Sequence, residues 1–152
     1  GSMKDIYYTI KNSIVWRYQK IRFGYSKREL WSLDHTITDF VLPRLKAFRH
    51  GESNNVTEGG PAGCPMLDGY DADKMGDAES DAMYQEWLDI LDKMIQAFEY
   101  HKLGMTDVKT NSSLWIQGGD EYKEYRNEEE RREQIIEEGL ALFGKYYQAL
   151  WD

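Results

Sequence analysis

The sequence predicts an all-α protein, a helical bundle of four or five helices with a long loop rich in Gly and Asp. Three observations support this fold class. Apolar residues recur at three-to-four spacing, polar and glycine-rich stretches separate the periodic segments, and two segments begin with helix-capping patterns. The chain has 152 residues, the usual length of one domain, so we expect a single helical domain over residues 1–152.

The first segment, from Asp5 to about Arg22, is expected to be a helix. Its apolar residues recur every four positions, at Ile6, Ile10, Ile14 and Tyr18. Its Tyr, Ile and Val content also suits a strand, and the pattern alone leaves that alternative open. Gly1 and Ser2 are expected to be a scar of protease cleavage.

A second helix is expected from Ser26 to His50. Ser26 and Glu29 form a capping-box pattern, and Gly51 is the residue type that ends helices in the left-handed conformation. Pro43 lies inside the apolar stripe. Because proline lacks an N–H group and collides with the preceding turn, it predicts a kink near residues 39–42 or a break into two helices.

Residues 51–78 are expected to form a long mobile loop, since they contain six glycines and two prolines and show no periodicity. The pattern of a helix resumes from Ser80 to Leu103, with Gly104 as its expected stop. A polar connection from Thr106 to Asp120 follows. Its apolar patch, residues 114–116, is expected to fold back onto the core.

The last helix is expected from Asn127 to Trp151, where Asn127 and Glu130 repeat the capping pattern. Gly139 and Gly144 lie inside it and each weakens a helix by about 1 kcal/mol relative to alanine. Close packing against another helix is the expected compensation at both glycines.

Four stretches of the sequence resemble a family of small uncharacterised proteins encoded by tailed bacteriophages. They are WSLD at residues 31–34, LPRLK at residues 42–46, ILDKMIQAFE at residues 90–99, and EGLALFGKYYQALWD at residues 138–152. The resemblance covers roughly half of the chain. It implies a phage origin and no particular activity, since the family has none assigned. Phages keep small non-structural genes largely to redirect host metabolism or to blunt host defence, which is an argument by analogy.

Charge is unevenly distributed along the chain, whose net charge is −8. Residues 1–50 carry ten basic and four acidic side chains, residues 51–100 two and twelve, and residues 101–152 seven and eleven. The acidic total argues against binding of duplex nucleic acid. No apolar run approaches the roughly 18 residues of a membrane span, so no membrane partner is expected. With Cys64 as its single cysteine, the chain cannot form an internal disulfide, and we expect it in the host cytoplasm.

No catalytic residue and no metal ligand is assigned, and no cofactor is expected. Cys64 lies in the Gly- and Pro-rich loop, and the three histidines are scattered at positions 35, 50 and 101. Two acidic pairs lie three residues apart, Glu86 with Asp89 and Glu130 with Glu133. Such pairs on two helices hold magnesium in all-helical nucleotide hydrolases. Around Glu130, however, arginines lie among the glutamates, which favours a solvated helix surface.

The basic and aromatic residues of the first 50 positions form the predicted ligand-binding site. Guanidinium groups recognise phosphate, aromatic rings stack on bases, and a helix N-terminus at residues 27–28 attracts anions. The predicted residues are Arg22, Tyr25, Lys27, Arg28, Trp31, Arg44 and Arg49. The alternative is that Trp31 packs in the core and that the basic residues contact the acidic half of the same chain or of another copy of it.

The preferred hypothesis is therefore a non-enzymatic phage accessory protein that sequesters a small anionic host molecule, such as a nucleotide immune signal. One alternative is a protein–protein inhibitor that binds a host enzyme through the acidic stretch at residues 68–92. The other is a metal-dependent nucleotide hydrolase. The aromatic content, 14% of residues, exceeds what one small core needs and predicts a homo-oligomer.

Overall fold

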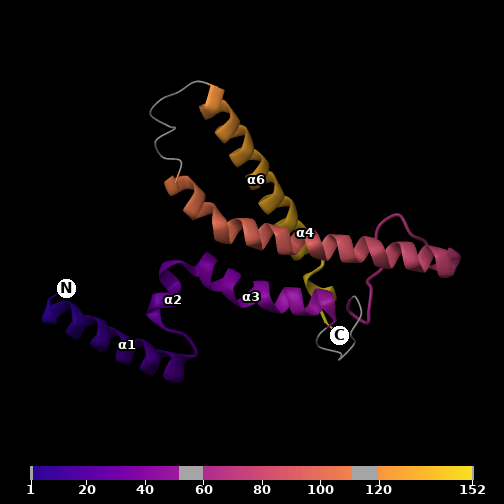
Figure 1. Ribbon diagram of the computed structural model, residues 1–152. Coiled ribbons are helices and arrows are strands. Elements are labelled where there is room, and N and C mark those ends of the chain that lie inside the picture. The colour runs from indigo at the N-terminus through magenta and orange to yellow at the C-terminus, as the bar shows by residue number, and fades with distance from the viewer. Residues whose placement is uncertain (1, 52–59, 111–119, 152) are drawn as a thin grey trace. The chain divides into compact units, whose positions relative to one another are not determined.

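The computed structural model describes residues 2–51, 60–110 and 120–151, except for the side chains of residues 105–110 and 120–122 (Figure 1). Within these ranges the protein is all-α, as predicted, and contains five α-helices, two short 3-10 helices and no strand. The α-helices are α1 (Met3–Phe23), α2 (Lys27–Trp31), α3 (Leu33–His50), α4 (Asp77–Thr110) and α6 (Asp120–Lys145). The 3-10 helices are η2 (Ala72–Lys74) and η3 (Tyr147–Ala149).

The chain divides into two compact units, where the sequence led us to expect a single domain. We call Gly1–Phe40 the N-terminal unit and Val41–Asp152 the acidic unit. The division falls inside α3, so each unit contains part of that helix.

The N-terminal unit begins with α1, which confirms the helix expected there. Gly24 ends α1 with a φ of 85°, and its N–H donates to the Lys20 carbonyl at 3.0 Å. The predicted capping box then starts α2, because the Ser26 N–H donates to the Glu29 carboxylate. A left-handed residue followed by a capping box makes a sharp boundary between the two helices.

The expected single helix from Ser26 is interrupted at a different residue from the predicted one. The break falls at Ser32, whose carbonyl accepts from the Thr36 N–H at 3.0 Å at the start of α3. Serine is a preferred residue at this boundary position. Pro43, by contrast, lies within the continuous helix α3 on an exposed face, where water can satisfy the carbonyl that proline leaves without an N–H donor.

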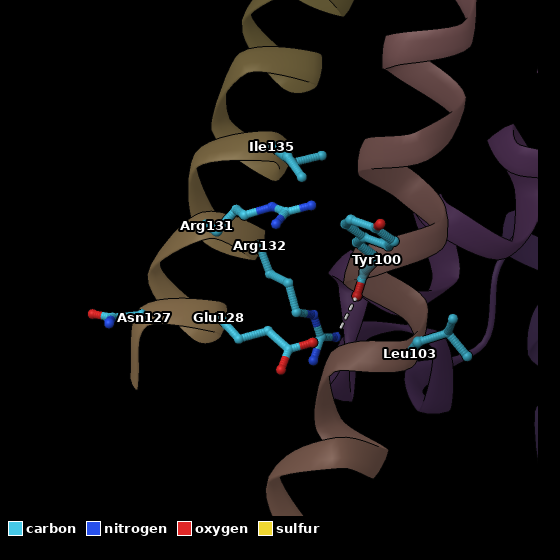
Figure 2. A pocket seen from close by; sticks show the side chains of 7 residues that line it. All are labelled: Tyr100, Leu103, Asn127, Glu128, Arg131, Arg132 and Ile135. Carbon is cyan, nitrogen blue, oxygen red and sulfur yellow. Dashed lines mark hydrogen bonds between the residues drawn. The ribbon is translucent and has the colours of Figure 1, made fainter. Parts of the chain in front are cut away.

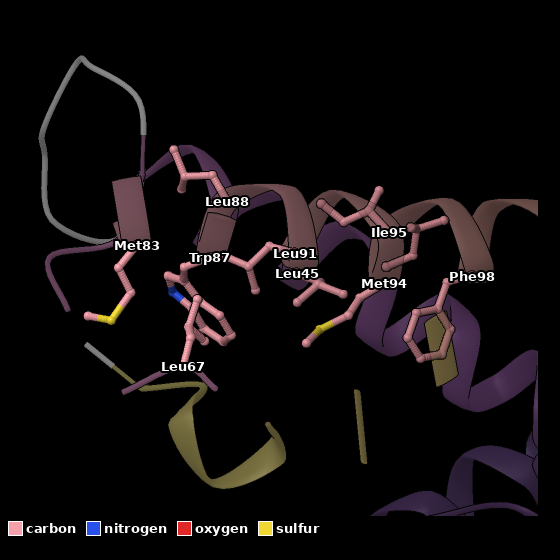
Figure 3. Close-up of a cluster of buried hydrophobic side chains, with 10 residues drawn as sticks. Leu45, Leu67, Met83, Trp87, Leu88, Leu91, Met94, Ile95 and Phe98 are labelled. Atoms are coloured by element: carbon pink, nitrogen blue, oxygen red, sulfur yellow. The ribbon is translucent and has the colours of Figure 1, made fainter. Parts of the chain in front are cut away.

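The acidic unit is built around α4 and α6, which run antiparallel. Most of its buried core residues belong to α4, as Figure 3 shows, and α6 packs against them with partly buried side chains. Trp87, Leu91 and Met94 of α4 are completely buried. Phe98 meets Phe143 of α6 edge to face, with ring centroids 5.2 Å apart. Further core residues come from α4, α3 and the segment before η2: Met83, Leu88, Ile95, Leu42, Leu45 and Leu67.

The ends of these two helices differ from the predicted ones. α4 continues through Gly104 to Thr110, α6 begins at Asp120 instead of Asn127, and α6 ends at Lys145 instead of continuing to Trp151. A glycine in a helix costs only about 1 kcal/mol, which the packing of so long a helix outweighs at Gly104. The patch at residues 114–116 lies outside the described residues.

Residues 60–76 pack against the core, which differs from the mobile loop predicted for residues 51–78. Leu67 is only 2% exposed. The Tyr84 hydroxyl donates to the Pro61 carbonyl at 2.9 Å, and Lys145 pairs with Asp68 at 2.6 Å. Residues 52–59 lie outside the described residues.

The two glycines of α6 have different surroundings. A Cβ atom on Gly139 would lie 2.6 Å from the Lys93 carbonyl oxygen and would also collide with the Ala97 side chain, so the close helix packing expected there is confirmed. A Cβ atom on Gly144 would meet no atom within 4 Å, so the same expectation is wrong for Gly144.

This contrast gives a matched pair of substitutions. Gly139→Ala should lower the free energy of unfolding by about 1–3 kcal/mol, because two helix backbones must separate to admit the methyl group. Gly144→Ala should raise it, by up to about 1 kcal/mol, because it improves helix propensity in open space. Urea denaturation followed by circular dichroism measures both, and equal effects of the two substitutions would contradict the packing described for Gly139.

Candidate functional site

The N-terminal unit contains a pocket of about 610 Å³ between α1, α2 and the first turns of α3. This volume lies in the range of small-molecule sites, roughly 300–1,000 Å³. Two tryptophans, three cations and several hydroxyl groups line it. The lining residues are Ser13, Trp16, Arg17, Lys20, Ser26, Arg28, Glu29, Trp31, Ser32, His35, Thr36 and Asp39. We refer to it below as the Trp16–Trp31 pocket.

The aromatic part of the pocket is a corner made by two indole rings. The rings of Trp16 and Trp31 stand almost perpendicular, at 88°, with centroids 5.8 Å apart. Trp31 is 67% exposed, so the alternative in which it packs in the core is wrong. An exposed indole held by a second one offers a flat apolar surface that a planar ligand can cover.

The guanidinium group of Arg28 lies beside the two indole rings. The Arg28 Cζ atom lies 5.0 Å from the centroid of the Trp16 ring, within the range of a cation–π contact. Stacking holds the guanidinium plane in place while its N–H groups remain able to donate. Arg17 lies one residue after Trp16 on α1 and supplies a second exposed guanidinium to the same pocket.

The carboxylate of Glu29 is held ionised by its neighbours. The Ser26 backbone N–H, followed by Lys20, lowers the pKa of Glu29 below its ordinary value of 4.5. Lys20 and Glu29 form an ion pair of 3.2 Å, so these two charges largely offset each other. Arg17 and Arg28 are the other two cations that line the pocket, and Asp39 contributes a second carboxylate.

The structure places only two of the seven predicted site residues in this pocket, Arg28 and Trp31. Arg22, Tyr25 and Lys27 belong to the same unit but do not line it. The Arg22 guanidinium lies over the Phe23 ring, with its Cζ atom 5.8 Å from the centroid.

The remaining two predicted residues, Arg44 and Arg49, belong to the acidic unit. Arg49 donates from Nε and Nη2 to both carboxylate oxygens of Asp92, at 2.9 and 3.3 Å. Lys46 pairs similarly with Glu99 at 2.6 Å. For Arg49 and Lys46 the alternative interpretation holds, because these basic residues meet the acidic part of the same chain.

The anion site expected at the N-terminus of a helix at residues 27–28 is not formed. α2 has only five residues, so its macrodipole is small. Two of its first three N–H groups already have partners, since the Lys27 N–H donates to the Gln19 side chain at 2.8 Å and the Glu29 N–H to the Ser26 carbonyl at 3.1 Å.

Sequence reasoning missed Trp16 as a site residue, although it is the other half of the aromatic corner. The only available signal was its place on α1: Trp16 lies outside the stripe of Ile6, Ile10 and Ile14, about 120° around the helix from its centre. A tryptophan away from the apolar stripe of a helix points to a role other than joining that stripe in a core.

A second pocket, of about 430 Å³, lies between α4 and α6 (Figure 2). Its two arginines are Arg131 and Arg132, and Glu128 also lines it. Arg132 donates to the Tyr100 carbonyl at 3.3 Å and lies over the Tyr100 ring, as Figure 2 shows. Because Arg132 and Tyr100 join the two helices, this contact serves the packing of the acidic unit.

The other reactive groups are engaged in structural contacts. Burial, followed by the charge of Glu86, raises the pKa of the Cys64 thiol, which makes it a weaker nucleophile at neutral pH. Glu86 accepts a hydrogen bond of 2.9 Å from the Tyr70 hydroxyl. Among the described residues, no group of three or more His, Cys, Asp or Glu side chains is gathered where it could hold a metal ion. None of the helices in the described ranges is both long and apolar enough to cross a membrane.

Comparison with known proteins returns no match. Neither a protein-family model, nor a curated protein, nor a solved structure is similar to this chain. The resemblance to phage proteins therefore stays a prediction.

The lowered pKa of Glu29 predicts a pH dependence. Its contribution to stability is present above the unfolded-state pKa near 4.5 and is lost as the pH falls through the lower folded-state pKa. Glu29→Gln should therefore lower the thermal midpoint at about pH 7, and this difference should shrink as the pH falls from 4.5 through the lowered folded-state pKa of Glu29. Thermal melts of both proteins test this, and a difference that does not change with pH would contradict it.

Proposed function

We propose that this protein binds a small anionic molecule with a planar group, such as a nucleotide, in the Trp16–Trp31 pocket and holds it without chemical change. The observation that carries the proposal is the exposed indole corner with Arg17 and Arg28 beside it. Base stacking on an aromatic side chain contributes about 1–3 kcal/mol, and guanidinium groups bind phosphate with paired hydrogen bonds.

The pocket offers each kind of group that a nucleotide needs. The indole face of Trp31 suits a base, Arg17 and Arg28 suit phosphate, and the hydroxyl groups of Ser13 and Ser32 suit sugar or phosphate oxygens. Stacking surfaces and phosphate-binding groups of this kind support the binding and sequestration of a ligand.

We further propose that the ligand is a host molecule and that the protein acts in the host cytoplasm during phage infection. This step rests on the resemblance of the four sequence stretches to phage proteins. A small protein that binds a nucleotide immune signal tightly would lower its free concentration and so blunt the host response.

A second candidate function is inhibition of a basic host protein through the acidic unit. Residues 41–152 carry 23 acidic and 12 basic side chains, and Asp77, Glu79, Asp81 and Asp89 at the start of α4 are exposed. Such a surface imitates the charge of a nucleic acid. A salt-sensitive host partner recovered by full-length protein, and lost when these four residues are replaced by Asn or Gln, is the result expected from this candidate.

The hypothesis of a metal-dependent nucleotide hydrolase is tested by a separate experiment. It predicts release of phosphate or pyrophosphate from a nucleotide with magnesium or manganese, and loss of this release in Glu86→Ala. Intact ligand after incubation would exclude it.

The binding proposal is tested by titrating the purified protein with linear and cyclic nucleotides in a calorimeter. We expect a dissociation constant below about 100 µM for at least one of them. Arg28→Ala and Trp31→Ala should each weaken binding by about tenfold or more, because one removes a charged donor and the other a stacking surface.

Arg22→Ala is the matched control, since it removes an arginine of the same unit that does not line the pocket. Its affinity should stay within about twofold of the native value. Equal losses in Arg22→Ala and Arg28→Ala would place the ligand elsewhere, and no binding by any nucleotide would end the proposal.

A further inference from the structure

The N-terminal unit has no apolar core of its own. Among its described residues only Ser26 and Thr38 are buried, and neither is apolar. Sixteen of its large hydrophobic side chains are exposed. Since burial of apolar surface is the main favourable term in folding, a unit of this kind needs a surface outside itself to pack against.

The largest continuous part of this exposed surface is one face of α1, which we call the α1 stripe. It consists of seven residues that, at 3.6 residues per turn, fall within about one third of the circumference of the helix. They are Met3, Ile6, Tyr7, Ile10, Ile14, Tyr18 and Ile21, and each keeps more than half of its surface exposed. Trp16 and Lys20 of the pocket lie on another side of the same helix, whereas Arg17 falls within the arc of the stripe, so the two surfaces adjoin at Arg17.

The area of the α1 stripe matches that of a protein–protein interface. Seven large side chains that expose about 100 Å² each give on the order of 700 Å². This exceeds the largest apolar patch of a typical monomer, about 300–600 Å², and approaches the roughly 800 Å² that each partner contributes to a standard interface.

The charges around the α1 stripe indicate what covers it. α1 carries five basic side chains and one acidic side chain, and Lys4, Lys11 and Arg22 follow one flank of the stripe. Two copies of α1 packed on each other would bring these cations together. The acidic unit has an excess of 11 negative charges and exposes the apolar side chains Leu140, Tyr147 and Trp151.

We propose that the α1 stripe packs against the acidic unit of a second copy of this chain, in a reciprocal exchange that makes a homo-oligomer. Apolar area on both surfaces and opposite charges favour this partner. An anionic lipid surface would match the stripe but would repel the rest of a chain whose net charge is −8. The proposal does not depend on the ligand of the Trp16–Trp31 pocket.

Light scattering coupled to gel filtration of the full chain tests the proposal. We expect the native protein to have at least twice the 17.9 kDa mass of the chain, and the double variant Ile10→Glu with Ile14→Glu to be a monomer. Asn12→Glu is the matched control, because it places one new carboxylate on the exposed opposite side of α1 and should leave the mass unchanged.

A second variant separates loss of folding from loss of assembly. Lys4→Glu with Lys11→Glu keeps the apolar stripe, and Glu at position 4 favours the N-terminus of a helix, so α1 should remain formed. Association should weaken by about tenfold at low salt, because the new carboxylates face an acidic partner. Tighter association would instead indicate that α1 packs on α1 and would overturn the proposal.

A native protein that is monomeric at all concentrations would also overturn it, by showing that the stripe is covered within one chain or by another partner. Flotation with vesicles of phosphatidylglycerol and phosphatidylcholine identifies the lipid case. Nucleotide binding is measured separately by calorimetry, so failure of this proposal and failure of the binding proposal are distinguishable.

Discussion

The close approach of α4 and α6 at Gly139 is the constraint on which the acidic unit depends. With no side chain at Gly139, the α6 backbone reaches the Lys93 carbonyl and the Ala97 side chain. That contact brings Phe143 onto Phe98 and Tyr146 onto Trp87, whose rings lie 5.2 and 5.5 Å apart. The Trp87 indole N–H is buried and has no hydrogen-bond partner among the residues that the structure describes, a cost of about 1–3 kcal/mol that this packing offsets.

Helix identity was predictable from the sequence because periodicity and capping are local properties. The capping box of Ser26 and Glu29 is one example, since its two hydrogen-bonding groups are three residues apart. Helix ends were predicted less well. Gly104 and Asn127 are residues that often end or begin helices, but their preferences of about 1 kcal/mol are weaker than the packing of α4 against α6, which local sequence does not reveal.

The sequence predicted which types of residue form the candidate site, but it did not predict which individual residues belong to it. Arg28 and Trp31 were identified because basic and aromatic residues are concentrated in the first 50 positions. Composition does not distinguish a guanidinium stacked on an indole from one paired with a carboxylate. Arg49 was included for the same reason as Arg28, yet its partner Asp92 is 43 residues away in the sequence. Trp16 was missed because its contact with Trp31 crosses the turn at Gly24.

The two proposals meet on one helix, because α1 presents Trp16 and Arg17 to the pocket and its stripe to a second copy. A helix that buries none of its residues within its own unit is weakly held there. Covering the stripe would hold α1 in place, and α1 forms the pocket together with α2 and the first turns of α3. By thermodynamic linkage, any partner that stabilises α1 strengthens ligand binding, and the ligand strengthens assembly by the same factor. An apolar stripe and a binding pocket that share α1 would thus couple the oligomeric state of the protein to its affinity for the ligand.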